Sequence, residues 1–121
     1  MKYILVADDE PLNQTIFQEM LDGVYECKTV DDGQACLESV ESRTPDLILL
    51  DVAMPRVDGT AVCRKLKNDE QTRHIPIILV SAYASENDKK SGLAAGADDY
   101  VTKPFDIDDL QQRIEQLLDK P

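Results

Sequence analysis

The stretch LILLDVAMP, residues 47–55, is the most informative part of this sequence about its fold. Its first four residues are aliphatic, which is typical of a parallel strand that is covered on both faces. Asp51 follows them directly, and a carboxylate at the edge of a hydrophobic core is costly unless something there requires it. We therefore interpret residues 47–50 as a buried strand that holds Asp51 at a functional site.

Similar runs elsewhere predict four more strands, at residues 3–7, 25–30, 77–80 and 100–102. The run at 25–30 carries Glu26 and Lys28 and is polar enough for an edge of the sheet. Between the strands, apolar residues recur at helical spacing. These stripes lie at residues 12–21, 35–40, 61–66, 93–97 and 107–118. We expect Gly23 to end the first helix and Asp106 to cap the last.

Strands that alternate with helices in this way predict an α/β fold. We expect a doubly wound, five-stranded parallel sheet with helices on both faces, and 121 residues suffice for a single domain spanning 1–121. Right-handed crossovers bring the carboxyl ends of all parallel strands to the same edge of the sheet. Ligands of such folds bind in the crevice at that edge.

Composition excludes several classes of partner. The net charge of −11 argues against binding to nucleic acid or to an anionic membrane surface. No apolar run is long enough to span a bilayer, and the N-terminal run is too short for a signal peptide. The three cysteines are widely spaced, which is typical of reduced thiols rather than of disulfides or a zinc site. We expect a cytoplasmic protein.

Polar residues follow four of the five predicted strands and should therefore meet at one edge. They are Asp8, Asp9 and Glu10 after the first strand, Asp51 after the third, Ser81 after the fourth and Lys103 after the fifth. Two carboxylates about 4 Å apart repel each other by about 4 kcal/mol at an effective dielectric constant near 20. One lysine offsets only part of that repulsion. Carboxylate oxygens without Cys or His suit a hard cation, so the sequence predicts a Mg²⁺ site.

Asp51 is also a candidate nucleophile, because a carboxylate can attack a phosphoryl group and form an aspartyl phosphate. Lys103 would neutralise charge on one phosphoryl oxygen, and the Ser81 hydroxyl would donate a hydrogen bond to another. Pro55 and Gly59 are expected to shape the loop that leaves Asp51 open to a donor. Each of these residues alone has a simpler explanation, since acids favour helix N-termini and lysines favour solvent. Their joint occurrence at one edge favours a site.

Four motifs resemble the receiver domains of two-component response regulators. They are DDE at 8–10, LILLDVAMPRVDG at 47–59, ILVSAY at 78–83 and GADDYVTKPF at 96–105. The resemblance covers essentially the whole chain, and it implies a CheY-like fold with strand order 2-1-3-4-5. It also implies that Asp51 accepts a phosphoryl group from a phosphohistidine on a bacterial sensor histidine kinase or histidine phosphotransfer protein.

The resemblance assigns roles to further residues. Asp9 would bind Mg²⁺ directly and Asp8 through water, while the backbone carbonyl of Ala53 would complete a site that Mn²⁺ can also occupy. Ser81 and Lys103 would contact the phosphoryl group. On activation Ser81 would move toward the phosphate and Tyr100 would turn inward. The surface of the fourth and fifth helices and the fifth strand would then change for a downstream effector or a fused output domain. A cis bond before Pro104 is also expected.

Two other functions remain open at this point. A phosphatase with an aspartyl intermediate commonly has a second acid two residues after the nucleophile, where this chain has Ala53. A phosphate-independent binding module could keep the fold without the chemistry. Ala53 and Tyr83 flank the expected phosphoryl position, so the resemblance does not imply how long the phosphorylated state lasts.

Overall fold

The computed structural model describes residues 1–54 and 57–119, and within them strands and helices alternate along the whole chain. The strands are β1 (Tyr3–Ala7), β2 (Glu26–Val30), β3 (Leu47–Asp51), β4 (Ile77–Ser81) and β5 (Asp99–Thr102). The helices are α1 (Pro11–Leu21), α2 (Gly33–Ser42), α3 (Gly59–Lys67), α4 (Glu86–Ala94) and α5 (Ile107–Leu118). None of the helices described is both long enough and apolar enough to cross a membrane.

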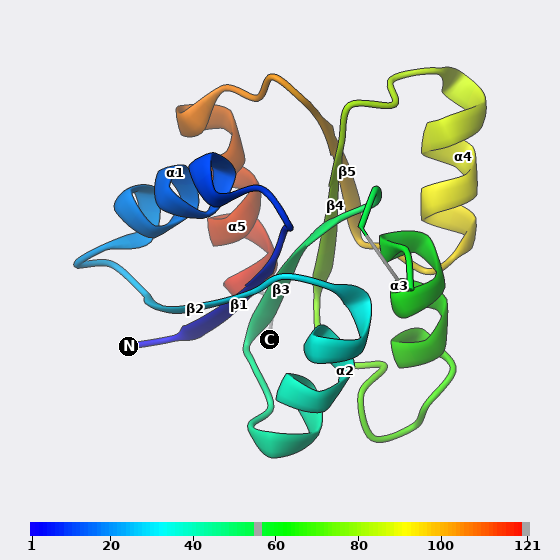
Figure 1. Cartoon of the computed structure of the whole chain (residues 1–121), viewed down its shortest axis with the longest axis horizontal. Helices are drawn as coiled ribbons and strands as arrows, with labels where there is room; N and C mark the ends of the chain where they lie inside the picture. Colours follow the sequence, from blue (N-terminus) through cyan, green and yellow to red (C-terminus); the bar gives the residue numbers. More distant parts are fainter. Residues whose placement is uncertain (55–56, 120–121) are drawn as a thin grey trace.

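The five strands form one parallel sheet in the order β2-β1-β3-β4-β5 (Figure 1). This order and the alternation confirm the predicted CheY-like fold. Each predicted strand matches an observed one to within a residue at either end. β2 lies at an edge, as its polar composition predicted.

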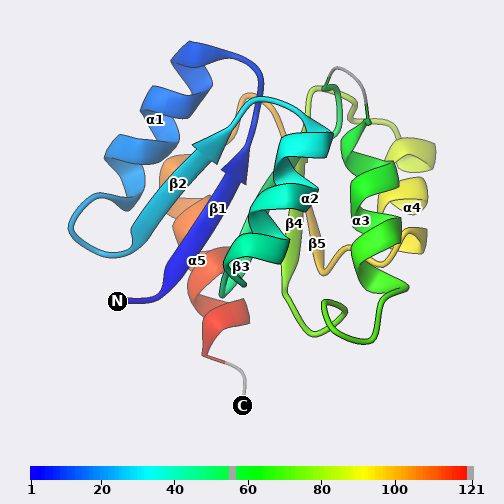
Figure 2. The ribbon, with the colours of Figure 1, turned by 60° about the horizontal axis from the view of Figure 1, so that its bottom comes forward.

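Helices cover both faces of the sheet (Figure 2). Phe17 of α1 and Leu110 of α5 pack with alternate strand residues on one face. Val40 of α2 and Leu66 of α3 pack with the other strand residues on the opposite face, and α4 lies on this side next to β5. Because successive side chains of a strand point to opposite faces, an uninterrupted apolar strand supplies both cores.

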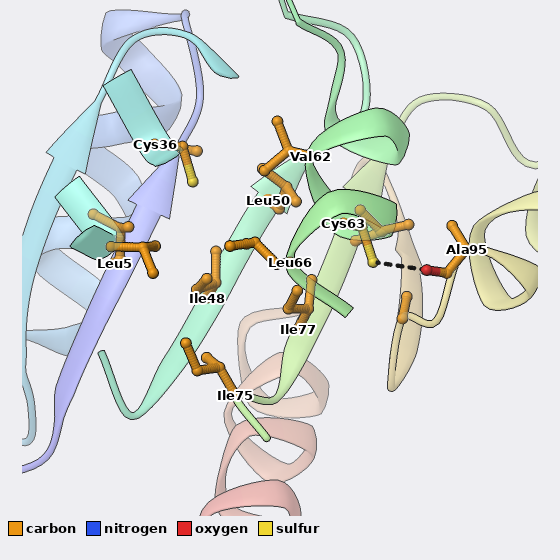
Figure 3. Close-up of a cluster of buried hydrophobic side chains, with 14 of the residues drawn as sticks. Leu5, Cys36, Ile48, Leu50, Val62, Cys63, Leu66, Ile75, Ile77 and Ala95 are labelled. Carbon is orange, nitrogen blue, oxygen red and sulfur yellow. Dashed lines mark hydrogen bonds between the residues drawn. The ribbon is translucent and has the colours of Figure 1, made fainter. Parts of the chain in front are cut away.

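The core on the α2–α3 side contains two of the three cysteines (Figure 3). Burial raises the pKa of Cys36 to about 12 and that of Cys63 to about 11. The Cys63 Sγ lies 3.8 Å from the carbonyl oxygen of Ala95. Both thiols therefore behave as small packed side chains, while Cys27 on β2 is partly exposed.

Local capping explains where most helices begin. The carboxylates of Asp32, Asp58 and Asp106 accept hydrogen bonds from backbone amides in the first turns of α2, α3 and α5, so the predicted Asp106 cap is confirmed. Gly23 follows the end of α1 with φ of +77°, as expected of a residue that ends a helix. α4 starts instead with a capping box of Ser85 and Asp88.

Three large apolar residues of the predicted stripes are exposed rather than buried in the core. Leu12 is 70% exposed, Leu93 50% and Ile107 47%. Leu12 and Ile107 lie in the first turns of α1 and α5, and Leu93 lies near the end of α4. Helical spacing shows which side of a helix is apolar but not how far the sheet extends beneath it.

An ammonium group joins two loops at the amino edge of the sheet. The Lys67 Nζ at the end of α3 donates hydrogen bonds to the backbone carbonyls of Arg73 and Ile75, at 3.2 and 2.8 Å. It also lies 2.8 Å from Asp98 Oδ2, which accepts a hydrogen bond from the Ile77 backbone amide. These contacts link the segment before β4 to the residue before β5.

Gly59 lets the start of α3 pack closely against the end of β3. A Cβ atom at this position would lie 2.0 Å from the Asp51 carbonyl oxygen. We expect Gly59→Ala to lower the free energy of unfolding by about 3 kcal/mol, because the backbone on both sides would have to shift. Gly23→Ala, with no atom near the added Cβ, should cost only about 1 kcal/mol from its positive φ. Urea unfolding of both variants measures the difference, and equal costs would contradict this packing argument.

Candidate functional site: an acidic pocket at the carboxyl edge of the sheet

The predicted site residues lie at the carboxyl ends of neighbouring strands. Asp51 is the last residue of β3 and Ser81 the last residue of β4, and Asp8 follows β1. All three are almost completely buried. The central position of β1, β3 and β4 in the sheet explains why these polar groups are covered.

Three carboxylates form a compact cluster at this edge. Asp8, Asp9 and Asp51 each offer an oxygen that lies within 4.8 Å of the others. Asp9 is exposed, so the cluster opens to solvent on one side. Because the cluster supplies only carboxylate oxygens, it fits a hard divalent cation such as Mg²⁺, which retains several water ligands.

Lys103 partly neutralises the cluster. Its Nζ lies 3.1 Å from Asp51 Oδ2 and 3.2 Å from Asp8 Oδ2. Although burial alone would lower the pKa of Lys103, the hydrogen bonds and negative charges of Asp51 and Asp8 hold that pKa above its usual value. The ammonium therefore stays charged. The peptide bond between Lys103 and Pro104 is cis, as expected from the sequence.

Asp51 keeps a raised pKa in spite of this ammonium. Burial raises the pKa of its carboxyl group, the Lys103 hydrogen bond and charge lower it, and the neighbouring Asp8 raises it again. The Ala53 backbone amide also donates a hydrogen bond to Asp51 Oδ1 at 3.2 Å. The net direction is upward because desolvation of the charged carboxylate outweighs its partners.

This raised pKa predicts a pH dependence of stability. The folded protein holds a proton on Asp51 more tightly than the unfolded chain does. The contribution of Asp51 to the free energy of unfolding should therefore fall as pH rises from the unfolded pKa to the higher folded pKa, and the loss should be complete above that range. Urea unfolding in EDTA at a series of pH values measures it. The stability difference between Asp51→Asn and the wild type should grow over the same range, and a difference independent of pH would contradict the shift.

Ser81 is connected to Tyr100 through the backbone of Tyr83. The Ser81 Oγ accepts a hydrogen bond from the Tyr83 amide at 2.9 Å, and the Tyr83 carbonyl accepts one from the Tyr100 hydroxyl at 2.7 Å. The Tyr100 side chain is 9% exposed and packs against α4, where Gly92 leaves room for its ring. The structure thus holds Tyr100 in an inward position.

Sequence reasoning missed one residue of the site. The Gln14 Nε2 on α1 donates hydrogen bonds to the Asp8 carbonyl oxygen at 2.6 Å and to Asp31 Oδ1 at 2.8 Å. No motif pointed to a neutral amide on a helix surface. Pro55 lies outside the described residues, whereas Gly59 makes the close backbone approach described above.

Comparison with known proteins identifies the family. A family model described as the response regulator receiver domain matches residues 4–115. The chain belongs to the response regulator receiver domain family. As a receiver domain of two-component systems, it is a phosphoacceptor signalling module.

Individual receiver proteins agree with this assignment. The chain is 44% identical over 115 residues to the response regulator PleD of Caulobacter vibrioides, covering 94% of this chain and 25% of PleD. It is 42% identical over 118 residues to the alkaline phosphatase synthesis transcriptional regulatory protein PhoP of Bacillus subtilis, covering 97% of this chain and 48% of PhoP. The chain thus spans between a quarter and half of the length of these two relatives.

A solved receiver domain is similar to this chain in both fold and sequence. The receiver domain of a sensor histidine kinase from Pseudomonas aeruginosa has a TM-score of 0.90 and 34% sequence identity to this chain, and the match covers 98% of each. That receiver domain has a magnesium ion coordinated in its active site cleft.

Proposed function

We propose that this receiver domain, residues 1–121, is a phosphorylation-activated switch whose phosphoacceptor is Asp51. The observation that carries the proposal is the buried Asp51 carboxylate at the end of β3, hydrogen-bonded to Lys103 and clustered with Asp8 and Asp9. A rigid strand end fixes the nucleophile. Lys103 and a cation held by the carboxylates would neutralise negative charge, and positioning and neutralisation are most of what phosphoryl transfer requires.

The metal ligands that we propose are Asp9 and Asp51 directly, Asp8 through water, and the backbone carbonyl of Ala53. The carboxylate cluster fits Mg²⁺, and Mn²⁺ is an alternative ion of similar ligand preference. A bound divalent ion would supply positive charge beside the phosphoryl oxygens.

The proposed reaction transfers a phosphoryl group from a phosphohistidine to Asp51. A carboxylate oxygen of Asp51 forms a bond to phosphorus while the bond from phosphorus to the donor imidazole nitrogen breaks, and the electron pair of that bond stays on the nitrogen. Lys103 neutralises charge on a phosphoryl oxygen, and the Ser81 hydroxyl, at the end of the neighbouring strand, donates a hydrogen bond to another.

The donor needs a docking surface beside Asp51. A hollow of about 530 Å³ lies between α1 and the start of α5, with Lys103 among its lining residues. Its apolar lining includes Ile16, Phe105 and the half-exposed Ile107. We propose that an apolar helix face of a sensor histidine kinase or histidine phosphotransfer protein docks here.

The proposed output runs through Ser81 and Tyr100. Movement of Ser81 toward the phosphoryl group would disturb its hydrogen bond with the Tyr83 amide, and Tyr83 in turn holds the Tyr100 hydroxyl. Tyr100 packs between β5 and α4, so the surface of α4, β5 and α5 would change. A downstream effector or a fused output domain would bind that surface.

Covalent labelling tests the proposal. The chain is incubated with Mg²⁺ and either acetyl phosphate or a phosphorylated histidine kinase, and its intact mass is measured. We expect the mass increase of one phosphoryl group, loss of that group on treatment with hydroxylamine, and no labelling in EDTA. Sustained turnover of phosphate esters would instead indicate a phosphatase. Neither labelling nor Mg²⁺ binding would indicate a phosphate-independent module.

A further inference from the structure

The turn that carries Asp8 and Asp9 is held from outside the pocket by a neutral side chain. The Gln14 amide on α1 donates one hydrogen bond to the Asp8 backbone carbonyl and a second to the side chain of Asp31, the residue after β2. We propose that Gln14 is a positioning residue that sets the affinity of the acidic cluster for its divalent cation. This inference rests on the proposed function.

The side chain and the backbone amide of Asp8 have partners other than Gln14. Its Oδ1 accepts a hydrogen bond from the Glu10 amide at 2.9 Å, and its Oδ2 lies 3.2 Å from the Lys103 Nζ. The Asp8 amide donates to the Val30 carbonyl at 3.1 Å. The peptide between Asp8 and Asp9 begins at the carbonyl that Gln14 holds, so Gln14 restrains the backbone that carries Asp9.

Restraint of this backbone matters because Asp9 is the exposed member of the cluster. A mobile Asp9 would spend part of its time outside ligating distance, and cation binding would then have to order it. Hydrogen-bond partners that orient metal ligands commonly change metal affinity by about 10- to 100-fold when they are removed. Gln14 also holds Asp31, an additional acid, at a fixed place beside β2.

The test compares two glutamines of the same helix. Gln14→Met removes the donor without changing charge, and Gln18→Met makes the same change at an exposed position one turn later. Mg²⁺ affinity is measured by isothermal titration calorimetry. We expect Gln14→Met to weaken Mg²⁺ binding by about tenfold, and Gln18→Met to bind as the wild type does. Gln14→Ala, which favours helix formation, serves as a second variant if the methionine variant folds poorly.

A second readout separates positioning from general stability. Amide hydrogen exchange in EDTA should show lower protection of Asp8 and Glu10 in Gln14→Met, with the strand interiors unchanged. In labelling assays the half-saturating Mg²⁺ concentration should rise, while the rate at saturating Mg²⁺ stays the same. Equal Mg²⁺ affinities for the two variants, or an equal loss of protection throughout the sheet, would overturn the inference. If the wild type bound no Mg²⁺, the proposed function would fail, and the exchange measurement would still decide the positioning role.

Discussion

Asp51→Asn is expected to lower the rate of phosphoryl labelling by more than about 10³-fold, because an amide oxygen is a poor nucleophile where a carboxylate is required. The variant should fold normally, since asparagine fits the same space and removes a charge that is costly to bury. Intact mass spectrometry after incubation with Mg²⁺ and acetyl phosphate measures the effect.

Asp58→Asn is the matched control for this variant. Asp58 caps α3 through a side-chain oxygen that asparagine retains, and the change in net charge is the same. The control should be labelled at the wild-type rate. Equal labelling of Asp51→Asn and the wild type would show that the phosphoacceptor is another residue.

Replacing Lys103 with methionine should slow phosphoryl transfer by about 100-fold, the usual effect of removing one donor that stabilises developing negative charge. The ammonium now lies 3.1 Å from Asp51 and 3.2 Å from Asp8. In EDTA the variant should also lose about 2 kcal/mol of stability, because two buried carboxylates lose their nearby cation. Single-turnover labelling and urea unfolding measure the two effects.

Lys65→Met, an exposed residue of α3, provides the control for loss of one positive charge. Exposed charges contribute little to stability, so this variant should differ from the wild type by less than about 0.5 kcal/mol. A Lys103→Met variant that is labelled as fast as this control would exclude Lys103 from the transfer step.

Most of the fold could be predicted from the sequence because hydrophobic pattern and topology act together. An aliphatic run such as 47–50 is typical of a buried parallel strand. Right-handed crossover connections then bring the carboxyl ends of all the strands to the same edge of the sheet. The convergence of Lys103 and Asp51 at one edge of the sheet followed from that topology without any knowledge of side-chain geometry. The sequence did not predict how far each helix extends beyond the sheet, as the exposed Leu12 shows.

The missed parts of the site depend on backbone groups. Gln14 binds a carbonyl oxygen, and Tyr100 reaches Ser81 only through the amide and carbonyl of Tyr83. Every residue except proline has both of these backbone groups, so a sequence carries no sign of which of them will be bound. Such contacts become visible only when the chain path is known in three dimensions.

The hydrogen bonds of Lys67 have a consequence for how the molecule deforms. They fix the segments that lead into β4 and β5 at the amino edge of the sheet. Ser81 and Thr102 lie at the carboxyl ends of these strands, at the opposite edge. Strain produced at the carboxyl ends would be opposed at the amino ends by these hydrogen bonds. We therefore expect the β4–α4 connection, which lies opposite Lys67, to move more on activation than the amino ends of β4 and β5 do.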